Sequence, residues 1–152
     1  SDPNFAASVH AISGSEPISW TSHHWTGLSI HDKNGNNEAG LDWLTGRSVA
    51  VRLGIGYPGP VIEALVRLGA KIAMQLPAGD HQPFSSTEIQ SIIKTSKSVD
   101  AIVMTLKDWV KARDVIDLSS MDCPIVVPDL ALEVVEGADE LDALLQSVFK
   151  LG

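Results

Sequence analysis

The chain has 152 residues, of which 44% are hydrophobic, 20% charged and 5% aromatic. This length and composition predict one globular domain with a single substantial core, and they exclude two domains of full size. Nineteen acidic and eleven basic residues give a net charge of −8 at pH 7. Nucleic acid is therefore excluded as the main partner, because its phosphates repel an acidic protein.

Three further features limit what the chain can be. Its apolar runs are far shorter than the ~20 residues that span a bilayer, so we expect no transmembrane segment. The single cysteine, Cys123, can form neither an intramolecular disulfide nor a thiolate metal cage, and we expect a small buried side chain there. The chain begins at Ser1 and its first methionine is Met74, so we expect a processed chain or a piece of a longer one.

The first part of the chain is irregular and then β-rich. Residues 1–17 are small, polar and interrupted by proline, and we expect an irregular arm. Between residues 18 and 30 apolar side chains recur at every second position around a polar centre, which predicts two short strands or one bent strand. Residues 32–37 are rich in Asn, Asp and Gly, which predicts a turn or an exposed loop. Residues 41–44 fit one short helical turn.

From Arg47 onward, short β-rich runs alternate with segments of helical periodicity. Predicted strands cover residues 48–53, 71–76, 101–104 and 124–127, and predicted helices cover 61–68, a segment from about 86, 106 to about 115, and 141–148. Strands that are apolar on both faces and alternate with helices indicate a parallel sheet covered on both sides. We therefore predict an α/β fold, a three-layer, Rossmann-like and mostly parallel sheet with helices on both faces, in a single domain spanning residues 18–152.

Two of the helix starts are marked in the sequence. Ser85 and Glu88 have the spacing of a capping box, in which a side chain and a backbone N–H bond each other reciprocally. Thr105 and Asp108 repeat this spacing at the next helix. Ligands bind beyond the carboxyl ends of strands in such sheets, so the functional residues are expected in the loops before these helices and in the loop after Leu53.

The loop after Leu53 carries glycines in a dinucleotide-binding pattern. Gly54, Gly56 and Gly59 follow a predicted strand and precede a predicted helix, as the Gly-x-Gly-x-x-Gly fingerprint requires. However, Pro58 and Pro60 remove N–H donors from the turn, and no acidic residue ends the next strand. The alternative is that the glycines let a tight turn pass close to another loop.

The other two loops carry polar candidates. Asp80 and His81 lie before a capped helix, where a histidine beside a carboxylate suits acid, base or anion-binding chemistry near neutral pH. A loop histidine bonded to the backbone is the alternative. Thr105 and Asp108 have a structural explanation as helix caps, whereas Lys107 at a helix start is disfavoured by the helix dipole unless it faces an anion.

Histidines and tryptophans cluster in the lead-in without a clear chemical pattern. His23, His24, His31 and Asp32 do not form a metal site in our interpretation, because adjacent residues on a strand point to opposite faces. The lead-in also holds most of the tryptophans, namely Trp20, Trp25 and Trp43. They are expected to pack against the sheet or, alternatively, to form a surface for a missing domain or a lipid.

The three loops together carry a family resemblance. Their sequences are Gly54-Ile55-Gly56-Tyr57-Pro58, then Asp80-His81-Gln82-Pro83-Phe84, and then Thr105-Leu106-Lys107-Asp108-Trp109-Val110-Lys111. In this order they resemble the C-terminal half of the tetraacyldisaccharide 4'-kinase family, the lipid A 4'-kinases, whose loops read roughly G-I-G-x-P, D-H-x-x-Y/F and T-E-K-D-x-V-K. The resemblance covers about residues 18–128, and Leu106 stands where the family has Glu.

The resemblance implies a piece of a lipid kinase. Family members transfer the γ-phosphate of ATP to the 4' position of a lipid A disaccharide precursor at the cytoplasmic face of the inner membrane. The sequence lacks a Gly-x-x-x-x-Gly-Lys-Ser/Thr phosphate loop. The resemblance therefore implies that ATP and Mg²⁺ are bound mainly by a missing N-terminal P-loop domain, that this chain alone binds neither, and that it is inactive alone.

Roles for individual residues also follow from the resemblance. His81 is expected at the active-site cleft, where it would partner a catalytic carboxylate from the missing half and help to activate the 4' hydroxyl. Asp80 would orient His81, and Lys107 would face phosphate together with Thr105 and Asp108. The first loop, with Gly54, Gly56 and Tyr57, would line the cleft. Two other functions stay open from the residues alone: a stand-alone dinucleotide-binding module, and a non-enzymatic interaction domain.

Overall fold

The computed structural model describes residues 20–79, 83–136, 143 and 146. The chain divides into two compact units, of which one is the continuous segment Trp25–Asp129 and the other combines Ser1–His24 with Leu130–Gly152. The segment Trp25–Asp129, called the central unit below, contains the three loops of interest. The predicted arm at residues 1–17 lies outside the described residues, and so does most of the predicted last helix. The domain bounds therefore stay a prediction.

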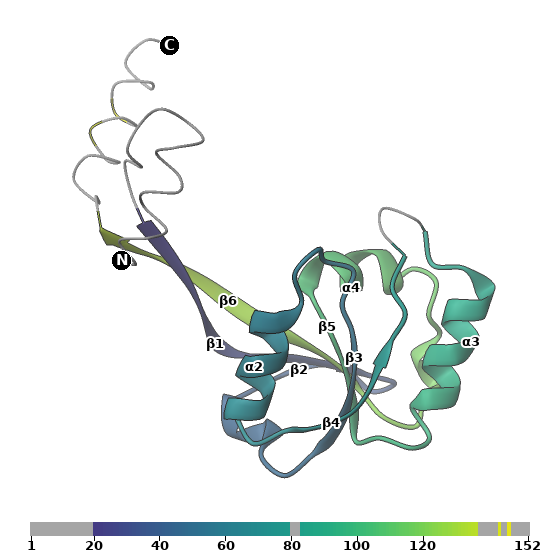
Figure 1. The fold of residues 1–152 in the computed structure, drawn as a ribbon. Coiled ribbons are helices and arrows are strands. Elements are labelled where there is room, and N and C mark those ends of the chain that lie inside the picture. The colour runs from purple at the N-terminus through teal and green to yellow at the C-terminus, as the bar shows by residue number, and fades with distance from the viewer. Residues whose placement is uncertain (1–19, 80–82, 137–142, 144–145, 147–152) are drawn as a thin grey trace. The chain divides into compact units, whose positions relative to one another are not determined.

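Within the described residues, six strands form one mixed sheet in the order β2-β1-β6-β5-β3-β4 (Figure 1). The strands are β1 (Trp20–Asp32), β2 (Gly35–Ala39), β3 (Ser48–Arg52), β4 (Lys71–Leu76), β5 (Ala101–Met104) and β6 (Ile125–Glu136). β3 pairs in parallel with β4 and β5, β5 pairs in parallel with β6, and β1 and β2 form an antiparallel hairpin.

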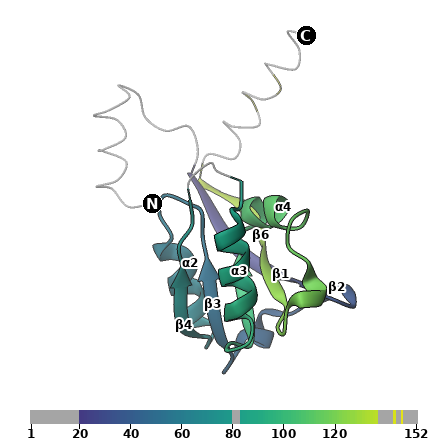
Figure 2. The same ribbon diagram turned by 90° about the vertical axis from the view of Figure 1, so that its right-hand side faces the viewer.

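In the part of the chain up to Glu136 that the structure describes, three α-helices cover the two faces of the sheet. They are α2 (Gly59–Arg67), α3 (Ser86–Thr95) and α4 (Leu106–Ala112), with two 3₁₀ turns at η1 (Leu41–Leu44) and η2 (Leu118–Ser120). Two views related by a quarter turn place α2 and α3 on opposite sides of β3 and β4 (Figures 1 and 2). The predicted α/β, Rossmann-like three-layer fold with a mostly parallel sheet is confirmed.

Each face of the sheet has its own apolar core. Alternate residues of β3 and β5 point to opposite faces, as a strand requires. Ala50, Ile102 and Met104 lie in one core with the buried side of α4. Val49, Val51 and Val103 lie in the other with Leu65 of α2. This division explains why β3 and β5 are apolar on both faces in sequence.

The tryptophans of the lead-in pack as expected where the structure describes them. Trp25 and Trp43 are half-buried against the second core. The Arg47 guanidinium lies over the Trp43 ring at 3.9 Å, a cation–π arrangement that covers the exposed side of the indole. The structure does not describe the side chain of Trp20. None of the helices in the described part of the chain combines the length and the apolar character needed to cross a membrane.

The lead-in differs from prediction in one place. Residues 32–37 were expected to be a turn or loop, but only Lys33 and Asn34 turn, and β2 already begins at Gly35. Gly35 has a φ of 130°, which lets the chain reverse so that Asn36 and Asn37 pair with β1. An edge strand is held by backbone hydrogen bonds and needs no buried side chains. The side chains of β2 are mostly exposed and polar, so its sequence lacks the apolar/polar alternation from which strands are predicted.

Two element lengths were also predicted wrongly. β6 extends from Ile125 to Glu136 instead of ending at residue 127. α4 ends at Ala112, short of residue 115, where the N–H of Val115 bonds the carbonyl of Ala112 three residues back and tightens the last turn. The apolar period continues through Ile116, so sequence alone extends this helix.

Candidate functional site

The carboxyl ends of β4, β3 and β5 lie side by side, because β3 is paired in parallel with both neighbours. The loops that leave these ends begin at Leu53, Pro77 and Thr105. They are the three loops that the sequence indicates as functional. The sheet therefore brings them to one edge, where ligands bind in folds of this class.

Asp108 joins two of these loops from a buried position. Its backbone N–H donates to Thr105 Oγ1 at 3.2 Å, which caps α4 as predicted. Its carboxylate Oδ2 accepts from Thr105 Oγ1 at 3.0 Å and from the backbone N–H of Gly54 at 2.8 Å. In a complete capping box the Asp108 carboxylate would accept from the backbone N–H of Thr105. Here it accepts from the Thr105 hydroxyl and the Gly54 N–H, so it holds the turn after β3 as well as the start of its own helix.

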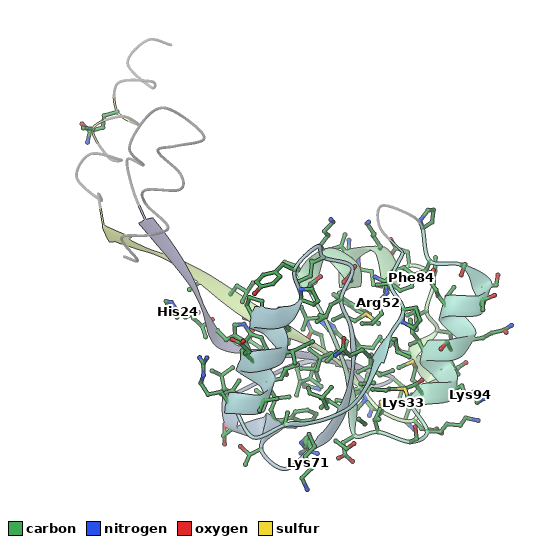
Figure 3. The ribbon with its side chains drawn as sticks, viewed as in Figure 1. His24, Lys33, Arg52, Lys71, Phe84 and Lys94 are labelled. Carbon is green, nitrogen blue, oxygen red and sulfur yellow. The ribbon has the colours of Figure 1, made fainter. Side chains whose placement is uncertain are left out.

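Arg52, the last residue of β3, completes the arrangement. Its Nη1 lies 2.7 Å from Asp108 Oδ1 and its Nη2 lies 3.0 Å from Glu88 Oε1. The guanidinium also lies over the Phe84 ring at 4.0 Å, and Figure 3 labels these two residues beside each other. Only 2% of the Arg52 side chain is exposed. One buried cation thus links the end of β3 with the starts of α3 and α4.

Glu88 is held by both its own helix and Arg52. Ser85 Oγ accepts from the Glu88 N–H at 3.2 Å and Glu88 Oε2 accepts from the Ser85 N–H at 3.0 Å, so the predicted capping box is confirmed. The pKa of Glu88 is lowered from its ordinary value, first of all by the bond from the Ser85 N–H. Burial opposes this shift, and the bond from Arg52 adds to it. This carboxylate therefore stays ionised at neutral pH.

Sequence reasoning missed Arg52, although a signal was present. The residue ends the run Val49-Ala50-Val51, in which each side chain is buried. A guanidinium in such a strand is tolerated only when carboxylates pair with it. Glu88 and Asp108, both at the third position of a helix, were available partners. Their distances from Arg52 along the chain, 36 and 56 residues, concealed the contact.

The close-approach interpretation of the glycine loop is supported at Gly54. A Cβ at this position would lie 2.6 Å from Asp108 Oδ1 and 3.1 Å from Arg52 Nη1, whereas one at Gly56 would meet nothing within 4 Å. The Gly54 N–H is already bonded to Asp108. It is thus not free for the pyrophosphate that the dinucleotide alternative requires. Tyr57, in the same loop, is 78% exposed.

The remaining candidates fall into two groups. Lys107 is exposed at the start of α4, consistent with an outward-facing cation. Asp80 and His81 lie outside the described residues, so their expected roles stay predictions. Direct contact of phosphate with Thr105 and Asp108 also stays a prediction, since the bonds found for them are internal to the protein.

The lead-in histidine described in most detail has a packing role. His31 stacks on Trp109 of α4, with ring centroids 4.3 Å apart. Burial lowers the pKa of His31, and the nearby Asp129 carboxylate opposes this only in part. Among the described residues, no three His, Cys, Asp or Glu side chains are grouped so that they could hold a metal ion.

Comparison with known proteins identifies the family of this chain. The model of the tetraacyldisaccharide-1-P 4'-kinase family matches residues 6–150. The chain belongs to this family. The resemblance predicted from three loop motifs is thereby confirmed, and the match covers the whole central unit. Leu106, which stands where the resemblance leads us to expect Glu, is 63% exposed.

Curated kinases from several bacteria show the same relationship. The chain is 38% identical over 69 residues to the tetraacyldisaccharide 4'-kinase of Rhodospirillum centenum, an alignment that covers 45% of the chain and 20% of the relative. It is 31% identical over 113 residues to that of Anaeromyxobacter sp. (strain K), covering 72% and 30%. For Chlorobaculum tepidum the identity is 33% over 100 residues, covering 64% and 29%. No solved structure matches significantly.

The alignments also give the scale of the chain within the family. It spans between 20% and 30% of the length of these three relatives. Most of each relative therefore has no counterpart in the 152 residues.

Proposed function

We propose that this chain is the C-terminal α/β domain of an ATP-dependent lipid kinase that phosphorylates the 4' position of a tetraacyldisaccharide lipid A precursor. The names of the relatives support the reaction, and the short span of the alignments supports a partial chain. In this proposal the chain is inactive without its N-terminal P-loop domain, and the parent enzyme works in the cytoplasm, peripheral to the inner membrane.

One observation carries the proposal: the family's motif loops leave adjacent parallel strands and are tied together by one buried network. Asp108 of the third motif accepts from the backbone N–H of Gly54 of the first, and Arg52 connects Asp108 to Glu88. The second motif precedes Ser85, whose capping box Glu88 closes. A rigid wall of this kind suits phosphoryl transfer, which depends mainly on positioning and charge stabilisation.

The residues then have the following proposed roles. His81 partners a carboxylate of the missing half, and this carboxylate takes the proton of the 4' hydroxyl. The hydroxyl oxygen attacks the γ-phosphorus of ATP, the bond from that phosphorus to the bridging oxygen breaks, and ADP leaves. Asp80 orients the His81 ring, and Lys107 faces phosphate charge. Gly54 and Tyr57 belong to the loop that lines the cleft. ATP supplies the phosphoryl group, and it is bound with Mg²⁺ mainly by the P-loop domain.

The role of His81 is tested in the full-length kinase that contains this chain. His81→Ala is expected to lower kcat by roughly 100-fold or more, the usual contribution of general acid–base catalysis, when phosphate transfer from radiolabelled ATP is measured. Gln82→Ala, one residue along the same loop, serves as the matched control and is expected to retain activity. An unchanged rate for His81→Ala would remove this role.

The incompleteness of the chain is tested separately. The 152-residue protein alone is expected to show no ATP turnover with the lipid substrate, because the phosphate-binding loop is absent from its sequence. Turnover by the purified chain would contradict the proposal that a second domain binds ATP.

A further inference from the structure

The helix α4 has an inner face that packs and an outer face that nothing in the central unit covers. Asp108, Trp109 and Ala112 are buried on the inner face. Leu106 and Val110 are 63% and 43% exposed on the outer face. Two large apolar side chains four residues apart lie next to each other on a helix surface. The outer side of α4 therefore presents a short apolar stripe to its surroundings.

Cations border this stripe on both sides. With 3.6 residues per turn, Lys107 and Lys111 follow Leu106 and Val110 around the helix, and Arg113 at the C-cap lies on the other side. All three cations are exposed. They are three of only eleven basic residues in a chain of net charge −8. Three basic residues thus lie within or next to one short helix, although the chain as a whole is acidic.

Acidic groups are nearly absent from this face. The one acid within the helix, Asp108, is turned inward and paired with Arg52. Asp114, which is exposed, follows only after the helix has ended. The surface made of Leu106, Val110, Lys111 and Arg113, called the α4 outer face, thus combines apolar contact with positive charge, while Lys107 keeps the phosphate-facing role proposed above.

We propose that the α4 outer face rests on an anionic phospholipid surface. Apolar side chains flanked by long cationic ones are typical of helices that lie in a membrane interface, where the apolar groups enter the acyl boundary and the cations reach phosphates. Nucleic acid is disfavoured as the occupant by the overall charge of the chain. Lipid satisfies both components.

The position of α4 gives this contact a purpose. The helix starts at Thr105, directly after β5, and so adjoins the edge where the three motif loops meet (Figure 1). Contact through this face would hold that edge against the layer in which an acylated substrate resides. This purpose rests on the proposed lipid kinase function, but the binding itself does not depend on ATP or on catalysis.

The test is co-sedimentation of the 152-residue protein with vesicles at low ionic strength. The protein is expected to bind vesicles that contain phosphatidylglycerol, and to bind phosphatidylcholine vesicles at least tenfold more weakly. Lys111→Glu with Arg113→Glu is expected to weaken binding about tenfold or more, because each basic residue near an anionic surface contributes about a factor of five. Val110→Ser is expected to weaken it severalfold.

Matched controls exist on the other helices. Lys94→Glu with Lys97→Glu makes the same charge change at the end of α3, where both lysines are exposed and Lys94 is labelled in Figure 3. Val66→Ser makes the same change at an exposed valine on α2, which is 57% exposed against 43% for Val110. Both controls should bind like the unmodified protein, and circular dichroism should show every variant folded.

Three results would overturn the proposal. They are no binding of the unmodified protein to anionic vesicles, equal binding to both vesicle types, and equal losses in the α4 and α3 double variants. His81→Ala should bind normally in this assay, so a failure of lipid contact and a failure of the catalytic role are distinguishable.

Discussion

At the scale of single residues, the central unit is organised around a buried cation. Arg52 would destabilise the interior if it were alone, since an unpaired buried charge costs about 3–5 kcal/mol. Asp108 and Glu88 offset that cost, and each carboxylate also bonds a backbone N–H, of Gly54 and Ser85 respectively. The bonds of Arg52 and of its two carboxylate partners therefore hold three loops at fixed distances from one another. Gly54 is the position at which this spacing leaves no room for a side chain.

Gly54→Ala should therefore be destabilising where Gly56→Ala is not. The new methyl group at residue 54 would overlap Asp108 Oδ1 and displace the buried pair, at a cost of about 1–3 kcal/mol, whereas residue 56 has open space. Urea unfolding followed by tryptophan fluorescence gives both free energies of unfolding. Equal effects of the two substitutions would show that the close approach at Gly54 is not a constraint.

At the scale of elements, the capped starts of α3 and α4 position the candidate site. Each helix is short, ten and seven residues, and so gains little from its own hydrogen-bond ladder. The N-cap residues fix where each helix begins, and the third residue of each then reaches Arg52. The caps therefore satisfy backbone N–H groups at the start of each helix. They also place the carboxylate of the third helix residue, Glu88 or Asp108, within reach of Arg52 at the end of β3.

Ser85→Ala should lower stability by about 1 kcal/mol, the usual cost of losing an N-cap hydroxyl. The neighbouring Ser86→Ala is the control, because that residue is exposed in the first turn and its loss is expected to change stability by less than about 0.5 kcal/mol. Thermal unfolding by circular dichroism measures both. If Ser85→Ala proved as stable as Ser86→Ala, the capping box would contribute nothing.

At the scale of the whole molecule, the two cores of the central unit lie on opposite faces of one sheet. Strands β3 and β5 contribute to both cores, so neither face can open without disturbing the residues that carry the motif loops.

The thiol of Cys123 can be used to monitor the opening of one of these faces. It belongs to the core under α3 and α4, and burial is the main cause that raises the pKa of its thiol to about 11.

Cys123 should consequently react with maleimide only when this face opens. At about pH 8 only about one thiol in a thousand would be ionised, and the side chain is 8% exposed. A Ser86→Cys variant supplies an exposed thiol as the positive control. Mass spectrometry is expected to show rapid single labelling of the variant and slow labelling of the original chain. Rapid labelling of Cys123 in native buffer would contradict the packing described.

Local signals in the sequence determined much of this protein. The alternation of apolar runs predicted the α/β class, Ser85 with Glu88 predicted a helix start, and three ordered motifs predicted the kinase family. These features depend on neighbours within a few residues or on short patterns, which a sequence displays directly. The polar edge strand β2 and the end of α4 were missed because backbone pairing and turn tightening leave no such pattern.

Only the tertiary structure decided what the site residues do. Asp108 has the sequence of a cap, yet its carboxylate binds Gly54 and Arg52, 54 and 56 residues away. The α4 outer face likewise gathers basic residues that composition alone conceals in an acidic chain. The physical reason is the same in both cases. Long-range charge pairing arises from the parallel pairing of strands, and the face of a helix that stays exposed depends on what packs against the helix. Spacing along the chain specifies neither.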